Sequence, residues 1–324
     1  MAGNQPSLWL GGFVADLPTP FDDRNRIDWY AFEMLCEHQI RSGATAVVVG
    51  ETMGETSTLS RKEQEEIIGA AVRITRGRLA VIAGADSNST SQAMELTREA
   101  EAAGADAVLS VVPYYNKPMQ SGIFAHFEAI AGSTGLPIIL HDVPSRTVCG
   151  ISDDTIVRLA QLKQFIGLKE STGSVARLFR LKSALPPAFR MLTGDDATAM
   201  AYLASGGDGC ISAVANLFPD LCRGIYEGCV AGNLGVSRSL SNRIAALGSL
   251  LAEDSSVAAL KYGMSMLGFM RPAVRLPLVE LGEDARKIIA LAMTAVGDNN
   301  QADEPKSSPK PSRQSGALSP AAIT

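Results

Sequence analysis

The sequence predicts an α/β protein folded as a (β/α)8 TIM barrel with a C-terminal helical extension. Eight short runs rich in Val, Ile and Leu recur along the chain, and most are followed by a stretch with helical spacing of apolar residues. Buried strands that alternate with helices favour a parallel sheet, because parallel strands need crossover connections. Eight such units in roughly 210 residues fit a closed barrel. A doubly wound open sheet is the alternative, but its usual glycine fingerprint is replaced here by Leu17-Pro-Thr-Pro20.

Each apolar run marks one predicted strand of the barrel. In chain order the runs are Phe13–Leu17, Ala44–Val49, Leu79–Ala83, Ala107–Val112, Pro137–Leu140, Phe165–Leu168, Phe189–Leu192 and Gly209–Ser212. After the second run, Ser60 precedes Glu63 by three residues, which is the spacing of a helix-initiating capping box.

The chain divides into three predicted segments. Residues 1–216 hold the barrel, and residues 217–297 carry helical patterns that predict an extension packed on it. Residues 298–324 contain four Pro, five Ser and no aromatic residue. Such a segment buries too little apolar surface to offset its ordering entropy, so we expect a disordered tail.

Composition excludes several classes of protein. Hydrophobic residues make up 46% of the chain and charged residues 19%, which is typical of a globular protein rather than a disordered or fibrous one. A net charge of −5 argues against nucleic acid or an anionic membrane as the main partner. Five scattered cysteines without CxxC spacing favour a reducing compartment. With neither a signal peptide nor a long apolar run, the expected location is the cytoplasm and no membrane contact is predicted.

The active site of a barrel lies at the carboxyl ends of its strands, so the residues that follow each apolar run are the candidates for chemistry. Polar or ionisable groups follow at least five of the runs. These segments are Gly50-Glu-Thr-Met-Gly-Glu55, Pro113-Tyr-Tyr-Asn-Lys117, His141-Asp-Val-Pro-Ser-Arg146, Gly167-Leu-Lys-Glu170 and Thr193-Gly-Asp-Asp196. Their convergence on one face predicts a single polar site there.

Lys169 is the strongest candidate for a catalytic residue within that site. It follows Phe165–Leu168 directly, and a lysine among apolar strands is expected to lose its proton more readily than one in water. A neutral amine is a nucleophile that attacks ketones to form an imine. The alternative is a lysine at the barrel rim that pairs with Glu170.

Four further residues have both a functional and a structural interpretation. Arg146 is suited to clamp a carboxylate, or is a surface ion-pair partner. His141 is an acid/base or a buried, hydrogen-bonded histidine, and Tyr115 is reactive or packs at a strand end. Thr52 and its neighbours offer backbone N–H groups to an anion, or simply form a turn. Nucleotide-binding glycine motifs, metal-ligand spacings and a GxSxG elbow do not occur in the sequence.

A series of short motifs follows in order from Gly12 to Leu281. They are Thr19-Pro20-Phe21, Gly54-Glu55, Thr58-Leu59, Val81–Gly84, Pro113–Pro118, Val143–Thr147, Ile166–Gly173, Gly194–Asp196, Gly209–Ser212 and Arg275–Leu278. In these motifs the sequence resembles the dihydrodipicolinate synthase / N-acetylneuraminate lyase family of class I aldolases. The resemblance is nearest to the dihydrodipicolinate synthase branch, because the double tyrosine and Arg146 are both present.

The resemblance implies roles for the candidate residues. Lys169 would form a Schiff base with pyruvate or another 2-oxo acid. Thr52 and Tyr115 would belong to a hydroxyl proton relay, with Tyr115 reaching into the site of a neighbouring subunit, and Arg146 would hold the carboxylate of the second substrate. Groups around Gly194 and Ile211 would line the pocket.

The family is typically a tetramer, a dimer of tight dimers, and works without a metal or an organic cofactor. The same assembly and the same independence of cofactors are expected here. The expected partner is a small pyruvate-like 2-oxo acid.

The sequence departs from the family pattern at positions that bear on activity. His141 stands where relatives carry the tyrosine of the relay, so we expect it to act as the acid/base near the imine. Met53 replaces a threonine of the carboxylate site, and Arg61, Gln64 and Gln92 occupy the lysine-feedback positions.

The departures leave more than one activity open. The main reading is a 4-hydroxy-tetrahydrodipicolinate synthase-like lyase that performs aldol condensation or cleavage. One alternative is a relative that dehydrates, deaminates or cleaves another 2-oxo acid or cyclic imine. The other is a barrel that has lost catalysis and binds a metabolite.

Overall fold

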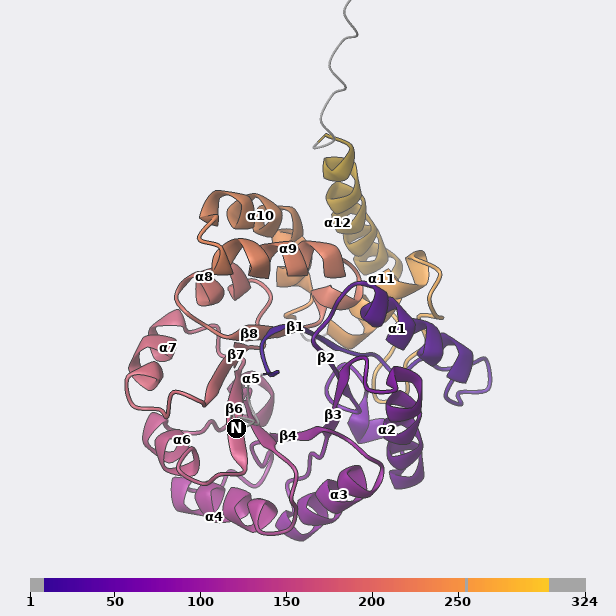
Figure 1. Cartoon of the computed structure of the whole chain (residues 1–324). Coiled ribbons are helices and arrows are strands. Elements are labelled where there is room, and N and C mark those ends of the chain that lie inside the picture. Colours follow the sequence, from indigo (N-terminus) through magenta and orange to yellow (C-terminus); the bar gives the residue numbers. More distant parts are fainter. Residues whose placement is uncertain (1–8, 254–255, 303–324) are drawn as a thin grey trace, which may run out of the picture.

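The computed structural model describes residues 9–253 and 256–302, and it forms a closed barrel of eight parallel strands surrounded by helices (Figure 1). Each strand pairs with its neighbour in the chain, and β8 closes the barrel by pairing with β1, with Val14 opposite Ile211. The predicted TIM barrel is therefore confirmed.

The strands lie close to the predicted runs but end at different residues. They are β1 Gly12–Asp16, β2 Ala46–Val49, β3 Ala80–Gly84, β4 Ala107–Val111, β5 Ile138–Asp142, β6 Phe165–Glu170, β7 Arg190–Thr193 and β8 Gly209–Ser212. Strands β5 and β6 run two residues further than predicted. His141 and Lys169 consequently belong to the strands themselves, where the backbone ladder fixes their direction.

The helices alternate with the strands around the barrel and then continue as a separate group. They are α1 Trp29–Arg41, η1 Thr56–Thr58, α2 Arg61–Thr75, α3 Thr90–Ala102, α4 Gln120–Ala131, α5 Pro144–Thr147, α6 Asp153–Leu159, α7 Val175–Lys182, α8 Ala199–Ala204, η2 Val214–Asn216, α9 Pro219–Val230, α10 Leu234–Leu250, α11 Ser256–Met266 and α12 Glu283–Ala302. The predicted capping box is present, since Ser60 accepts from the Glu63 N–H and the Glu63 side chain accepts from the Ser60 N–H.

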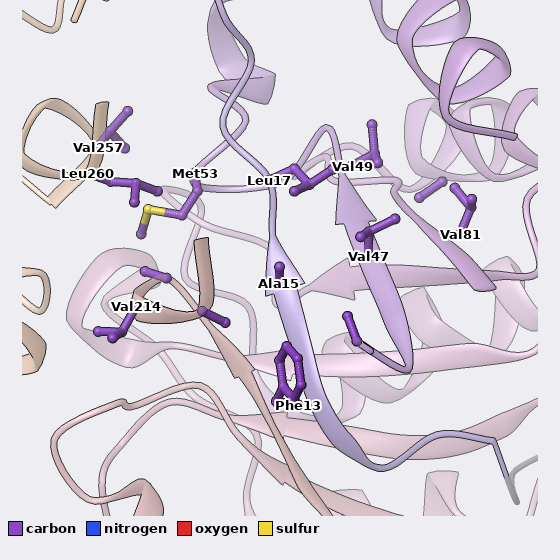
Figure 2. Packing of buried hydrophobic residues seen from close by; sticks show 14 of the residues in the cluster. Phe13, Ala15, Leu17, Val47, Val49, Met53, Val81, Val214, Val257 and Leu260 are labelled. Atoms are coloured by element: carbon purple, nitrogen blue, oxygen red, sulfur yellow. The ribbon is translucent and has the colours of Figure 1, made fainter. Parts of the chain in front are cut away.

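Alternate residues of each strand face opposite sides of the barrel wall. In β1, Phe13 and Ala15 face the surrounding helices with Leu17 beyond them, as Figure 2 shows. Val14 faces the barrel interior, where it joins an apolar cluster. The other members of that cluster are Leu10, Ala46, Val48, Ile82, Ala107, Leu109, Ile139, Ile166, Leu192 and Ile211. This cluster fills the interior, so the polar site can form only at the carboxyl end.

The C-terminal segment differs in part from the prediction. Helices α9 to α11 lie at one side of the barrel, near β1, β8 and α1, and α12 packs on α10 and α11 and points away from the barrel (Figure 1). Residues 267–282 form turns and extended chain between α11 and α12, where an all-helical extension was expected. Helix α12 continues to Ala302, past the expected start of the tail at residue 298. Residues 303–324, the rest of the predicted tail, lie outside the described residues.

Candidate active site

A cavity of about 270 Å³ opens at the carboxyl ends of the strands. Seven of the eight residues predicted for the site line it, together with Asp16 and Ser171. The seven are Thr52, Met53, His141, Arg146, Lys169, Gly194 and Ile211. The structure thus gathers onto one cavity residues that are up to 159 positions apart in the sequence, from Thr52 to Ile211.

Lys169 lies at the floor of this cavity between two buried carboxylates. Its side chain is 5% exposed, and its Nζ lies 3.1 Å from Asp16 Oδ2 and 3.2 Å from Glu51 Oε2. Asp16 comes from the end of β1 and Glu51 from the turn after β2. The lysine therefore has acidic partners from two other strands, instead of the apolar surroundings expected from the sequence.

These carboxylates reverse the expected change in the pKa of Lys169. Burial alone would lower the pKa of Lys169, but the charges of Glu51 and Asp16 and their hydrogen bonds outweigh it and hold that pKa above its usual value. The prediction that apolar packing keeps this amine neutral is wrong for the unliganded protein. Lys169 rests as an ammonium ion and must pass a proton on before it attacks a carbonyl.

The two carboxylates differ in protonation. Burial raises the pKa of Asp16 to about 8, with the charge of Glu51 adding to the rise and Lys169 opposing it. Burial acts in the same sense on Glu51, but Lys169 and His141 hold its pKa well below the ordinary value. Glu51 is therefore the stronger acid of the pair and ionises first, and a proton shared by the two carboxyl groups rests on Asp16.

Glu51 also contacts the candidate acid/base. Its Oε1 lies 2.8 Å from His141 Nδ1, and its Oε2 accepts the Thr52 N–H at 2.6 Å. On the other side of the ring, His141 Nε2 lies 3.2 Å from Ser171 Oγ. Burial, and then the charge of Lys169, lower the pKa of His141, so the imidazole is neutral at pH 7.

Residues that alternate with the site residues face outward and hold the strands together. Arg177 Nη1 lies 2.6 Å from Asp142 Oδ2 and 3.3 Å from Glu170 Oε1, and its Nε lies 2.8 Å from Asp153 Oδ1. Glu170 is thus engaged on the opposite side of the wall from Lys169. The alternative interpretation of Lys169 as the ion-pair partner of Glu170 is wrong.

Arg146 reaches from the short helix α5, which follows β5, toward the C-terminal helices. Its Nη2 donates to Ser256 Oγ at 2.7 Å, at the start of α11. Arg146 lines the cavity, and within residues 9–253 and 256–302 it forms no ion pair with a carboxylate. A planar group with several donors in this position is suited to bind a substrate carboxylate.

A second buried lysine attaches the C-terminal segment to the loop that carries Glu51 and Thr52. Lys261 of α11 is fully buried, pairs with Glu55, and donates to the Ala273 carbonyl at 2.9 Å. Arg275 pairs with Glu63 at 2.6 Å and donates its backbone N–H to Glu55 at 2.9 Å. Figure 2 shows Met53 beside Val257 and Leu260 of the same helix. These contacts fix the loop after β2 relative to α11.

Tyr115 is the one predicted site residue that does not line the cavity. It is 89% exposed and has a φ of 71°, a left-handed conformation that costs a bulky residue energy. Lys117, two residues on, also has a positive φ of 47°. The loop after β4 therefore projects Tyr115 away from the site of its own chain.

Sequence reasoning missed three residues of the site. Asp16 falls inside a predicted apolar strand, and a carboxylate among Val and Ala is itself a signal, since buried carboxylates are rare without a partner. Glu51 stands next to Thr52, and Ser171 stands two residues after Lys169, but their side-chain directions depend on where β2 and β6 end.

The described residues give less support to a metal site, a disulfide or a membrane-spanning helix. In residues 9–253 and 256–302, no group of three or more His, Cys, Asp or Glu side chains is placed to hold a metal ion. All five cysteines are free thiols. Within the same residues, no helix has the length and apolar character needed to cross a bilayer.

A buried lysine with carboxylates and an imidazole beside it, in a cavity at the carboxyl end of a TIM barrel, defines a class I aldolase or lyase, which works through a Schiff base. Residues 10–296 match the profile of the dihydrodipicolinate synthetase family. A 4-hydroxy-tetrahydrodipicolinate synthase from Methylobacterium radiotolerans is 41% identical over 288 residues, which cover 89% of this chain and 96% of that one. The chain belongs to this family, and it is a dihydrodipicolinate synthase-like lyase.

Solved structures agree with this assignment. A chloride-inhibited dihydrodipicolinate synthase from Acinetobacter baumannii, complexed with pyruvate, has a TM-score of 0.86 and 37% identity, covering 89% of this chain and 99% of that one. A monomeric dihydrodipicolinate synthase variant has a TM-score of 0.87 and 31% identity, with coverage of 90% and 99%.

Proposed function

We propose that Lys169 forms a Schiff base with pyruvate or a closely related 2-oxo acid, and that the resulting enamine adds to an aldehyde. The observation that carries this proposal is the contact of Lys169 Nζ with two buried carboxylates in the cavity. Imine formation moves two protons from the ammonium group to the carbonyl oxygen, which leaves as water. Glu51 accepts protons from Nζ, and so does Asp16 once it has ionised.

Arg146 is proposed to bind a carboxylate of the second substrate. It is an exposed residue that lines the cavity, and its Nη2 donates to Ser256 Oγ. Thr52, Met53, Gly194 and Ile211 are proposed to form the walls around the 2-oxo acid. Because Met53 offers no hydroxyl, the backbone of the loop after β2 carries more of the carboxylate recognition than a threonine-bearing loop would.

The assembly is proposed to be at least a dimer, and a tetramer by family resemblance. Support comes from Tyr115, whose strained and exposed position is explained if the ring enters a partner's site. A cytoplasmic location is proposed on the basis of the free cysteines.

Borohydride trapping tests the proposed chemistry. Wild-type protein incubated with pyruvate and borohydride is expected to gain the mass of one reduced pyruvate adduct per chain, and Lys169→Ala none. An unmodified wild-type protein would instead support a metabolite-binding barrel without catalysis. Release of pyruvate from another oxo acid, with no condensation of pyruvate with aspartate semialdehyde, would favour the catabolic alternative.

A further inference from the structure

We propose that Ser171, His141 and Glu51 form a proton relay that removes a proton from C3 of the imine on Lys169 and later returns it to the carbonyl oxygen of the second substrate. This inference rests on the proposed Schiff-base function. It adds Ser171 as the catalytic residue that meets the substrate. It also gives Glu51, which touches Lys169 Nζ during imine formation, a second role in positioning His141.

Three contacts in a row define the relay. Ser171 Oγ lies 3.2 Å from His141 Nε2, and His141 Nδ1 lies 2.8 Å from Glu51 Oε1. Ser171 lines the same cavity as Lys169 and stands two residues beyond it. The imidazole and the carboxylate are 2% and 1% exposed, so water does not compete for their contacts.

The protonation states give the relay a direction. His141 Nδ1 lies 2.8 Å from the ionised Glu51 Oε1 without being aligned for a hydrogen bond, and the charge of this carboxylate favours a proton on the nearer ring nitrogen. We therefore place the proton of the neutral imidazole on Nδ1, which leaves the Nε2 lone pair for the Ser171 hydroxyl. The resting relay is therefore oriented to take a proton from the cavity. The charged groups that face His141 are Glu51 and Lys169, whereas Asp142 points to Arg177 on the other side of the wall.

The proposed step balances in atoms and charge. The C3–H bond of the protonated imine breaks, and its electron pair becomes the carbon–carbon double bond of the enamine. Ser171 Oγ takes that proton while its own proton passes to His141 Nε2. The imidazolium that results lies against the Glu51 carboxylate. When the enamine attacks an aldehyde, the proton returns by the same route to the new alkoxide.

The surroundings of Ser171 favour proton transfer over nucleophilic attack, although Ser171, His141 and Glu51 have the order of a hydrolytic triad. A hydrolase needs free N–H groups beside the serine to stabilise an oxyanion. Here the Ser171 N–H donates to the Asp142 carbonyl, the Gly194 N–H to the Glu170 carbonyl, and the Thr172 N–H to the Glu170 side chain. All three donors are therefore already occupied.

Gly194 keeps the serine in place. A Cβ at this position would lie 2.1 Å from Ser171 Oγ and 3.0 Å from Lys169 Cε. Only glycine therefore allows the serine and the lysine to lie together over β7. This packing places the Ser171 hydroxyl and the Lys169 side chain against the same face of Gly194 in the cavity.

Exchange of the methyl protons of pyruvate in D2O, followed by proton NMR, measures enamine formation without a second substrate. We expect Ser171→Ala to retain borohydride trapping of pyruvate but to lose about a hundredfold in exchange rate. Ser249→Ala, the same change on the exposed face of α10, is the matched control and should exchange at the wild-type rate. The proposal would be overturned if Ser171→Ala exchanged the methyl protons at a rate within twofold of wild type. It would also be overturned if the variant lost trapping and exchange to the same extent.

Glu51→Gln tests the positioning role through pH. Because the Glu51 charge raises the pKa of His141, its removal should slow exchange and move the acid limb of the exchange profile to lower pH. An unchanged limb would overturn the role of Glu51. If the wild-type protein neither traps pyruvate nor exchanges its methyl protons, the Schiff-base proposal itself is refuted. Trapping of pyruvate without exchange would refute only the proton relay.

Discussion

His141 of β5 and Lys169 of β6 are register partners in neighbouring parallel strands, so their side chains rise at the same level of the barrel interior. Glu51 contacts both of them from the turn after β2. The nitrogen proposed to form the imine and the base proposed to act on that imine are thus joined through one carboxylate. The loss of any one of these three groups changes the protonation of the other two.

Removal of the lysine should destabilise the protein in a pH-dependent way. Lys169→Met leaves Glu51 buried without its cation, which typically costs about 3–5 kcal/mol. In the wild type the pKa of Glu51 is depressed, so its stabilising contribution is present above its unfolded pKa near 4.3. In the variant the lowering of this pKa by Lys169 is lost while the effect of burial remains, so Glu51 takes up a proton more readily at low pH. Urea unfolding should show that the variant loses more free energy of unfolding, relative to wild type, at pH 8 than at pH 5. Equal losses at the two pH values would contradict the ion pair.

The histidine should leave a signature in the pH profile of deuterium exchange into pyruvate. His141 acts as a base only when neutral, and burial lowers its pKa below the ordinary 6.5. The wild-type rate should therefore rise with pH along a limb below pH 6.5 and then level off. His141→Phe should be slower by about a hundredfold and lack the limb. If the limb persists in this variant, it reports the titration of a group other than His141.

Arg146 should matter for the second substrate alone. Arg146→Ala removes a bidentate partner for a carboxylate, so we expect the KM of a carboxylate-bearing aldehyde to rise at least about tenfold. Exchange into pyruvate, which needs no second substrate, should stay within about twofold of wild type. If exchange fell as far as condensation, Arg146 would instead serve the 2-oxo acid.

Tyr115 should couple activity to assembly. Light scattering is expected to report at least a dimer, and Tyr115→Phe should slow condensation while leaving the molar mass unchanged. The matched control is Tyr226→Phe, a half-buried tyrosine on α9, outside the loop after β4. A fully active monomer would contradict the proposed exchange of tyrosines between subunits.

The sequence was sufficient for the barrel because its eight apolar runs and their spacing depend on local patterns. It also located Lys169, His141 and Arg146 at the carboxyl ends of the strands. It could not give the protonation of Lys169, because that depends on Asp16 and Glu51, which are 153 and 118 residues away. Nor could it show that β5 and β6 extend two residues further, which directs His141 toward Ser171 and Asp142 toward Arg177.

The site of the pyruvate adduct is the most direct test of the central claim, because two lysines of the described residues, Lys169 and Lys261, are buried. Burial lowers the pKa of Lys261 to about 8, which makes it the easier amine to deprotonate, yet it pairs with Glu55 away from the cavity. Lys169 has the higher pKa but lines the cavity. After borohydride reduction and proteolysis, tandem mass spectrometry is expected to place the adduct on Lys169 alone. An adduct on Lys261, or one spread over surface lysines, would contradict the account.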